Sequence, residues 1–173
     1  MIEQIDALTR IANEFSHFAK MPKPVFAETN LRELLEKVVA LYADKENTSI
    51  TFQSFDDSHC KAFIDKDQII RVLNNLITNA IQAIPPEKTG RVHITLRHGK
   101  NYILIRINDN GVGISEENRK HLFVPNFTTK STGTGLGLAM VKTIVEQNNG
   151  HVFYRSRENK GASFFVKLPI SEE

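Results

Sequence analysis

Hydrophobic residues along the chain follow two different periods, and each period predicts a different kind of element. Apolar residues recur every three or four positions in four stretches, as in amphipathic helices: residues 2–20, 31–42, 66–84 and 136–147. Six shorter stretches are strand-like, most with alternating apolar and polar residues: residues 49–55, 60–65, 91–98, 101–109, 150–157 and 162–169. Together they predict an α+β fold, a two-layer sandwich in which helices cover one face of a mixed, mainly antiparallel sheet.

Capping residues set the expected ends of the helices. Thr29 or Asn30 is a suitable N-cap for the second helix. Asp65 and Gln68 form a capping pair at the start of the third helix, which must end near Pro85 because proline lacks the backbone N–H that a helix needs.

Turn residues predict how the strands are joined. The polar residues 56–58 predict a turn between strands 49–55 and 60–65. Gly99 and Lys100 predict a hairpin between the next two strands, and the last two strands form a second hairpin.

The first helix is expected to belong to a separate unit. Pro22 and Pro24 in the segment MPKP stop it at Met21 and predict a stiff joint. Its single apolar stripe needs a partner that the nearby sequence does not offer. We therefore divide the chain into an appendage, residues 1–24, and a domain, residues 25–173.

The third helix carries amides opposite its apolar face. Gln68, Asn75, Asn79 and Gln82 share that side of the helix. A solvated helix face usually carries Lys and Glu, and Asn is a poor helix former. The amide face therefore favours contact with a ligand over contact with water alone.

The segment DNGVGI follows the fifth predicted strand. Asp-Asn-Gly is ordinary turn chemistry. The alternative is that Asp109, fixed at a strand end, accepts a hydrogen bond from an exocyclic amine such as that of adenine, while Gly111 and Gly113 allow close backbone approach. The segment alone leaves both interpretations open.

A glycine-rich segment, TTKSTGTGLGLAMV, leads into the last helix. Gly133, Gly135 and Gly137 leave backbone N–H groups at the positive end of that helix, where an anion binds well, and Lys130 adds a positive charge. The spacing matches neither the dinucleotide fingerprint nor the P-loop.

The order of these motifs is more specific than any one of them, and it resembles the catalytic ATP-binding domain of sensor histidine kinases. The wider superfamily includes gyrase B, the Hsp90 chaperones and MutL. LNNLITNA is similar to the N box, DNGVGI to the first glycine box, LFVPNFTTK to the F box and GTGLGL to the second glycine box. The resemblance covers residues 30–169 and implies the Bergerat ATP-binding fold.

The resemblance also implies roles for individual residues. Asn79 would bind Mg²⁺ and Asn75 the phosphates or the waters of the metal, while Asp109 would bind the adenine amine with Ser163 as a helper. Asn75, Asn79 and Lys130 would be the catalytic residues. The implied ATP site comprises Asn75, Asn79, Gln82, Asp109, Gly111, Gly113, Phe123, Phe127, Thr129, Lys130, Gly133, Thr134, Gly135, Leu136, Gly137, Leu138 and Ser163.

One position separates kinases from hydrolases in this superfamily. The ATP-hydrolysing relatives carry a Glu one turn before the metal-binding Asn, and this chain has Asn75 there. Transfer of the ATP γ-phosphoryl group to a His is therefore expected. The alternatives are an ATP-hydrolysing clamp and a nucleotide-regulated module in a mainly phosphatase-type parent.

His17 is not the expected phosphate acceptor. The segment HFAKMP has Phe18 and Met21 where the acceptor box of these kinases has an acid and an Asn or Thr. Residues 1–24 instead resemble the end of the dimerisation helix and its linker, especially in the nitrogen-regulation branch. The implied partners are an upstream dimerisation domain that carries the acceptor His, a response-regulator receiver domain and, in the parent, a second subunit.

The amino-acid composition changes this prediction little, but it argues against nucleic-acid-binding, disulfide-linked and zinc-cluster proteins. The 22 basic and 20 acidic residues give a net charge of +2, which argues against nucleic-acid binding. Cys60 is the only cysteine, so an internal disulfide and a thiolate zinc cluster are excluded. Without an apolar run of membrane-spanning length or a secretion signal, a cytoplasmic domain without membrane contact is expected. An inner-membrane sensor as the parent protein is compatible with this expectation.

Overall fold

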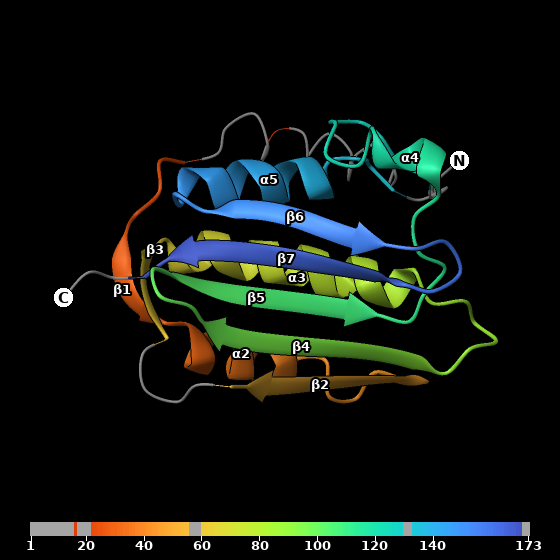
Figure 1. Cartoon of the computed structure of the whole chain (residues 1–173), viewed down its shortest axis with the longest axis horizontal. Helices are drawn as coiled ribbons and strands as arrows, with labels where there is room; N and C mark the ends of the chain where they lie inside the picture. The colour runs from red at the N-terminus through yellow and green to blue at the C-terminus, as the bar shows by residue number, and fades with distance from the viewer. Residues whose placement is uncertain (1–15, 17–21, 56–59, 130–132, 171–173) are drawn as a thin grey trace.

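The computed structural model describes residues 16, 22–55, 60–129 and 133–170 (Figure 1). The predicted helix over residues 2–20, including His17, lies outside this part of the chain except for Ser16. The elements in order are β1 (Ala27–Asn30), α2 (Leu31–Ala40), β2 (Thr48–Ser54), β3 (Lys61–Ile64), α3 (Lys66–Gln82), β4 (Gly90–His98), β5 (Tyr102–Asp109), α4 (Glu116–Arg119), α5 (Gly137–Gln147), β6 (His151–Ser156) and β7 (Ala162–Pro169).

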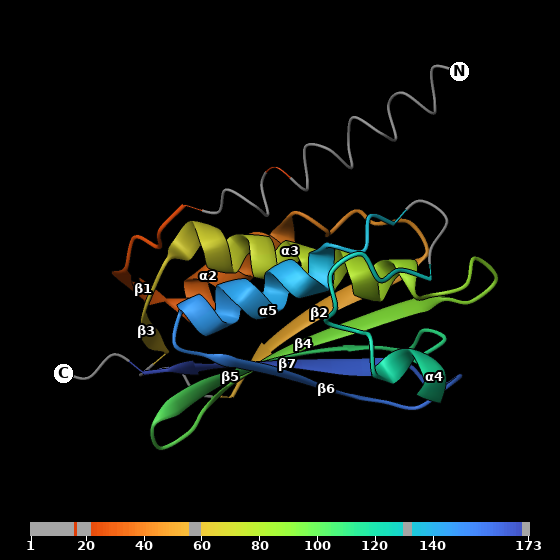
Figure 2. The ribbon, with the colours of Figure 1, turned by 90° about the horizontal axis from the view of Figure 1, so that it is seen from above.

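The main sheet has five strands in the order β2-β4-β5-β7-β6. β2 runs parallel to β4, and all other neighbouring pairs are antiparallel. α2, α3 and α5 lie together on one side of this sheet (Figure 2). The predicted two-layer α+β sandwich is therefore confirmed.

The core lies between the sheet and these helices. Leu73 and Ile77 on α3 are fully buried, as are Ile94 on β4 and Ile105 on β5. Burial of each such side chain contributes roughly 1.5–3 kcal/mol, so the apolar stripe of α3 holds the helix firmly on the sheet. Among the helices in the described residues, none has the combination of length and apolarity needed to cross a membrane.

The two strands on either side of the predicted turn at residues 56–58, which lies outside the described residues, are not neighbours in the structure. β2 and β3 both exist, but they lie in different sheets. β2 pairs with β4, and its Ile50 and Phe52 pack against the hydrophobic core, whereas β3 pairs with β1 in a separate two-stranded sheet. β1 has four residues, AETN, without apolar alternation, so the sequence pattern does not reveal it.

The N-terminus of α3 is capped, but not by the predicted reciprocal pair. Asp65 caps the helix as expected, because its Oδ1 accepts a hydrogen bond from the Gln68 N–H (3.0 Å). The Asp65 N–H, however, donates to Oδ1 of Asn148 (2.7 Å) rather than to the Gln68 side chain. Asn148, which follows α5, therefore fills the role that sequence assigns to Gln68.

Gln68 joins the same buried network and connects it to the segment before the domain. Its Oε1 accepts from Nδ2 of Asn148 (3.1 Å), and its Nε2 donates to the Pro22 carbonyl (3.2 Å). Oδ2 of Asp65 accepts from the Val25 N–H (2.8 Å). Asp65, Gln68 and Asn148 are at most 8% exposed, so these bonds are shielded from water. The network fixes residues 22–25 to the ends of both α3 and α5.

We predict that Asn148→Ala lowers the free energy of unfolding by roughly 2–4 kcal/mol. The substitution leaves the buried Asp65 N–H and the Gln68 Oε1 without their partner. Urea unfolding followed by circular dichroism measures the change. Asn101→Ala, at an exposed turn position, is the matched control and should change stability by less than about 0.5 kcal/mol. Equal stability of the two variants would contradict the assigned network.

Candidate functional site

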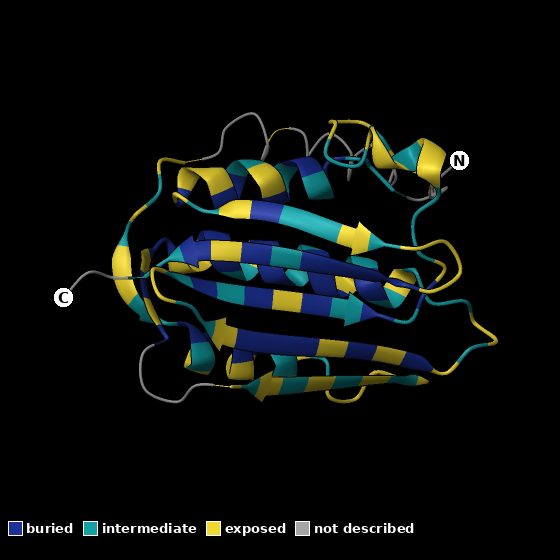
Figure 3. Ribbon diagram, viewed as in Figure 1, coloured by how far each residue is buried: buried dark blue, intermediate teal, exposed yellow. Residues whose placement is uncertain are grey.

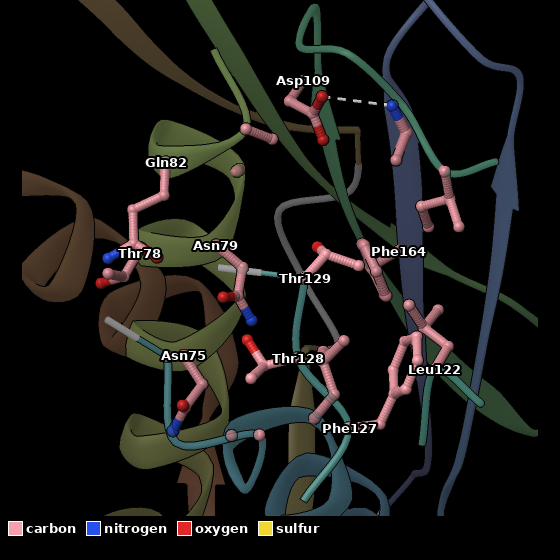
Figure 4. Close-up of a pocket in the computed structure, with 18 of the residues that line it drawn as sticks. Asn75, Thr78, Asn79, Gln82, Asp109, Leu122, Phe127, Thr128, Thr129 and Phe164 are labelled. Atoms are coloured by element: carbon pink, nitrogen blue, oxygen red, sulfur yellow. Dashed lines mark hydrogen bonds between the residues drawn. The ribbon is translucent and has the colours of Figure 1, made fainter. Parts of the chain in front are cut away.

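A cavity of about 470 Å³ opens between α3, the end of β5 and the segment that leads into α5 (Figure 4). Its lining includes most of the predicted residues: Asn75, Asn79, Gln82, Asp109, Gly113, Phe127, Thr129, Gly133, Thr134, Gly135, Gly137 and Leu138. Residues that lie far apart in sequence thus meet in one place. Lys130 lies outside the described residues, so its role stays a prediction.

Asp109 lies at one end of the cavity and is held by backbone groups. Its Oδ1 accepts from the Gly111 N–H (2.8 Å) and from the Ala162 N–H (3.2 Å). Its Oδ2 has no hydrogen bond to a described residue, so it is the oxygen that can serve a ligand. The carboxyl group is therefore an oriented acceptor.

Burial raises the pKa of the Asp109 carboxyl above its usual value of 3.8. The two backbone hydrogen bonds and the nearby Lys88 ammonium lower the pKa, but the loss of hydration outweighs them. The residue is 4% exposed. A buried carboxylate that costs stability yet is held in place is typical of a functional site.

The amide face of α3 forms one wall, although not along its whole length. Asn75, Asn79 and Gln82 border the cavity, with Thr78 beside them (Figure 4). Gln68 belongs to the buried network at the other end of the helix, so the prediction that it faces a ligand is wrong. Helical period alone places Gln68 with the other amides and does not show which turn the cavity reaches.

The first turn of α5 lies directly against α3. A Cβ atom at Gly137 would stand 2.7 Å from Oδ1 of Asn75, so a larger residue here would displace the Asn75 amide. Nδ2 of Asn75 donates to the Arg71 carbonyl (2.9 Å), which fixes the direction of that amide. Neither a side-chain cap nor an acidic residue occupies the start of α5. Its first N–H groups are therefore available to an anion.

Gly113 shows why the first glycine motif is needed. Its φ is 71°, in the left-handed region, and its α-carbon faces the carbonyls of Arg157 and Gly161 in the β6–β7 turn. The Val112 N–H donates to the Ala83 carbonyl (2.9 Å) at the end of α3. The motif therefore packs against the β6–β7 turn and against the end of α3, the two elements that lie beside Asp109.

Four other predicted residues do not line the cavity. Ser163 lies on the opposite face of the sheet, where its Oγ donates to Oδ1 of Asn108 (2.7 Å), so its predicted position near the base is wrong. The neighbouring residue Ala162 faces Asp109 instead. Phe123 packs on Tyr154 of β6, with the ring centroids 6.1 Å apart. Gly111 and Leu136 are buried behind the lining.

Sequence reasoning missed several lining residues, most of them apolar or small. Thr78 and Thr128 are adjacent to predicted residues, and Ile114 lies within the DNGVGI motif, so motif proximity was an available signal. The sequence does not reveal that Leu122 and Phe164 line the same cavity, because that placement depends on the fold. The missed lining residues are Thr78, Ala80, Ala83, Val112, Ile114, Leu122, Thr128, Ala162 and Phe164.

The donor set is compatible with a metal ion carried by phosphates, not with a metal held by the protein alone. Within the described residues no cluster of three or more His, Cys, Asp or Glu side chains is placed to bind a metal. Asn79 offers an amide oxygen to the cavity. Mg²⁺ commonly takes one or two protein oxygens and completes its shell with phosphates and water. One amide beside a phosphate site therefore fits Mg²⁺.

Comparison with known proteins places the chain among ATP-binding kinase domains. Residues 64–172 match the family described as histidine kinase-, DNA gyrase B-, and HSP90-like ATPase. The whole chain is 32% identical to nitrogen regulation protein NtrY of Azorhizobium caulinodans and covers 23% of it. Over 98% of its length it is 33% identical to sensor histidine kinase ZraS of Salmonella typhimurium, of which it covers 37%. The chain therefore spans less than half of these curated relatives.

Solved structures of histidine kinases also match this chain. The nucleotide-free catalytic domain of histidine kinase ThkA matches with a TM-score of 0.75 and 32% identity, covering 84% of this chain and 95% of that one. ThkA in complex with the response regulator TrrA matches with a TM-score of 0.81 and 28% identity, covering 98% of this chain and 49% of that one.

We predict that Asp109→Asn stabilises the protein at neutral pH. The raised pKa means that the folded state binds the Asp109 proton more tightly than the unfolded state does, so the wild type loses stability as the pH rises from about 3.8 through the folded pKa. Asparagine keeps an oxygen for the Gly111 and Ala162 N–H groups without the buried charge. The stability difference between variant and wild type should therefore be largest at pH 7 and shrink toward pH 4.

Urea unfolding across this pH range measures the difference. Asp44→Asn removes an exposed carboxylate and is the matched control, with little change expected at any pH. A destabilised Asp109→Asn variant at pH 7 would contradict the assigned charge cost.

Proposed function

The chain belongs to the family of histidine kinase-, DNA gyrase B- and HSP90-like ATPases, as a catalytic domain of the sensor histidine kinase type, and on that premise we propose that its cavity binds Mg-ATP and presents the γ-phosphoryl group to a histidine. The observation that carries the proposal is the layout of the cavity. A fixed carboxylate lies at one end and a helix N-terminus with adjacent amides at the other. That layout matches a nucleotide, with its base at one end and its anionic phosphates at the other.

At the base end, we propose that Oδ2 of Asp109 accepts the hydrogen bond of the adenine amine. Ile114, Leu122 and Phe164 provide apolar surface for the ring. Transfer of a flat aromatic ring from water to such a surface is favourable, and the one oriented acceptor supplies specificity. Gly111 and Leu136 support this site from behind and do not touch the ligand.

At the phosphate end, the N–H groups at the start of α5 would bind the phosphates, with Gly133, Thr134 and Gly135 closing over them. Asn75 and Asn79 would orient the phosphate chain from α3. Mg²⁺, with Asn79 as a ligand, would neutralise phosphate charge. We propose that Lys130 and Phe127 belong to a lid that shields this end from water.

Among the described residues that line the cavity, none is suited to activate water. Asp109 is the only acidic residue among the lining residues, and it lies at the base end. Asn75 and Asn79 are neutral amides that cannot accept a proton from a nucleophile. The residues in place therefore position ATP for a nucleophile that arrives from outside the cavity. This argues for phosphoryl transfer and against an ATP-hydrolysing clamp.

The remaining assignments concern the parent protein. We propose that residues 1–24 are the end of the dimerisation helix and its linker, and that residues 25–173 are the catalytic domain. The acceptor His would lie on a dimerisation domain within a homodimer. A receiver domain would take the phosphoryl group onto an Asp, a step supported by the ThkA complex with a response regulator. Because ATP is the substrate, the domain would work in the cytoplasm, in a parent that we place at the inner membrane.

We predict that Asp109→Asn weakens ATP binding on the order of 100-fold. With Oδ1 held by the Gly111 and Ala162 N–H groups, the amide would direct its NH₂ group at the adenine amine, so two donors would face each other. The same NH₂ group suits the carbonyl that GTP presents there, so the preference for ATP over GTP should fall. Isothermal titration calorimetry with both nucleotides measures this, with Asp44→Asn as control. Unchanged ATP affinity would refute the assigned base site.

We also predict that the chain binds labelled Mg-ATP without steady hydrolysis and without phosphate on His17. One reason is that no described lining residue at the phosphate end can act as a general base. The other is that Phe18 and Met21 beside that histidine do not match the acceptor box. Phosphate release and acid-labile label on the chain are the measurements, with His17→Ala as the control for labelling and Asn79→Ala for phosphate release. Steady release that Asn79→Ala abolishes would favour the hydrolysing clamp. Label that His17→Ala abolishes would make this chain a complete autokinase.

A further inference from the structure

The sheet face that lies opposite the nucleotide side is strongly basic. α2, α3 and α5 cover one face only, and the other face is turned toward the viewer in Figures 1 and 3. Figure 3 shows exposed and buried positions alternating along several of the strands. The strand register assigns five cations to outward positions and no Asp or Glu. We define the basic face by these cations: Arg91, Arg97, Arg106, Arg155 and Lys167.

These cations have no carboxylate partner among the described residues, although Arg32, Lys61 and Lys142 elsewhere do form ion pairs. Several are held over aromatic rings instead. The Arg97 guanidinium lies 4.4 Å from the centre of the Phe55 ring, and Nζ of Lys167 lies 4.1 Å from that of Tyr102. Such stacking orients a cation but leaves its charge unpaired.

Arg106 and Arg155 lie on either side of an aromatic cluster. Their guanidinium carbons are 5.7 and 5.9 Å from the centre of the Phe165 ring. Arg106 is fixed further by hydrogen bonds from its NH2 group to Ser163 Oγ (3.0 Å) and Asn108 Oδ1 (3.1 Å). The Arg106 guanidinium is therefore a preorganised binding group, and the exposed Arg155 guanidinium lies near the same ring.

A shallow depression of about 310 Å³ continues the basic face at the β6–β7 turn. Its lining contains three cations, Arg155, Arg157 and Lys160, together with the polar side chains of Asn108 and Ser163. Glu158, the acidic residue of this turn, does not belong to the lining. The depression has the size and the donors to accept a carboxylate side chain.

We propose that the basic face is a docking surface for an acidic protein surface that also carries exposed apolar side chains. Fixed guanidinium groups match carboxylates in pairs, and Arg with Phe and Tyr is the composition found at protein interfaces. The partner places a carboxylate in the depression and apolar side chains against Phe153 and Phe165. Docking there leaves the nucleotide cavity open, because the cavity lies on the helix side of the sheet.

The aromatic geometry argues against nucleic acid as the occupant. The Phe153 and Phe165 rings are 4.7 Å apart with planes inclined by 4°, so they stack on each other. The His151 ring stacks against Phe153 in turn, at 6.0 Å. The ring faces are therefore already occupied, whereas a single-stranded nucleic acid needs free ring faces for its bases. Both phenylalanines are also half-buried and do not protrude as membrane-inserting side chains do.

The test uses the full chain and defined probes. Fluorescent peptides in which Glu alternates with Leu, or with Ser at the same charge, are titrated with wild type and with Arg106→Glu/Arg155→Glu. We expect the Glu-Leu peptide to bind more tightly than the Glu-Ser peptide, and the double variant to weaken it on the order of ten-fold or more. Lys37→Glu/Lys45→Glu changes the net charge equally on exposed residues elsewhere and should leave binding within about two-fold. Arg155→Glu/Arg157→Glu tests the depression separately.

Several outcomes would overturn the proposal. Equal loss of binding in the control pair would show a response to net charge alone. Tighter binding to phosphatidylserine vesicles or to oligo-dT than to the Glu-Leu peptide would assign the face to a membrane or to nucleic acid. Thermal melting checks that every variant is folded, and the ATP affinity of every variant should stay unchanged. Because ATP affinity is read independently, failure of this proposal is distinguishable from failure of the proposed nucleotide site.

Discussion

The nucleotide site depends on the antiparallel packing of α3 against α5, which is locked at both ends. At one end, Asn148 after α5 accepts the Asp65 N–H at the start of α3. At the other, the first residue of α5, Gly137, lies against the Asn75 amide of α3. The amide wall and the helix N-terminus that would bind phosphates are therefore positioned by one packing relation. A rotation of either helix would move one half of the phosphate site away from the other.

Residues 22–25 are bound to the same hydrogen-bond network that joins α3 to α5. The Pro22 carbonyl and the Val25 N–H bind Gln68 and Asp65, which are the groups that Asn148 contacts. A movement of the preceding segment would therefore act first on the ends of α3 and α5, not on the sheet. The buried amides transmit such a movement because none of them can lose its partner without an energetic cost.

Much of the fold and the site follows from sequence, for identifiable reasons. The helices and hairpins have strong periods and local caps, and the motif order brings Asn79, Asp109 and Gly135 to one cavity. The failures arise where tertiary contacts decide. The partner of β3 is a strand too short to show a period, and Gln68 is drawn into a network with a residue 80 positions away. Ser163 lies on the strand that borders the cavity, but its side chain is on the opposite face of the sheet. A single step along a strand reverses the direction of a side chain.

That same alternation separates the two surfaces of the domain. Ala162 donates its N–H to Asp109 on the nucleotide side, and the next residue, Ser163, accepts from Arg106 on the basic face. Asp109 and Asn108 stand in the same relation on β5. A partner on the basic face and a nucleotide in the cavity would therefore contact adjacent residues of β5 and β7 without competing for space. The cations of the basic face come from four strands, so the charge asymmetry of the sheet emerges only once the register is known. A net charge of +2 hides it, since the balancing carboxylates lie elsewhere on the chain.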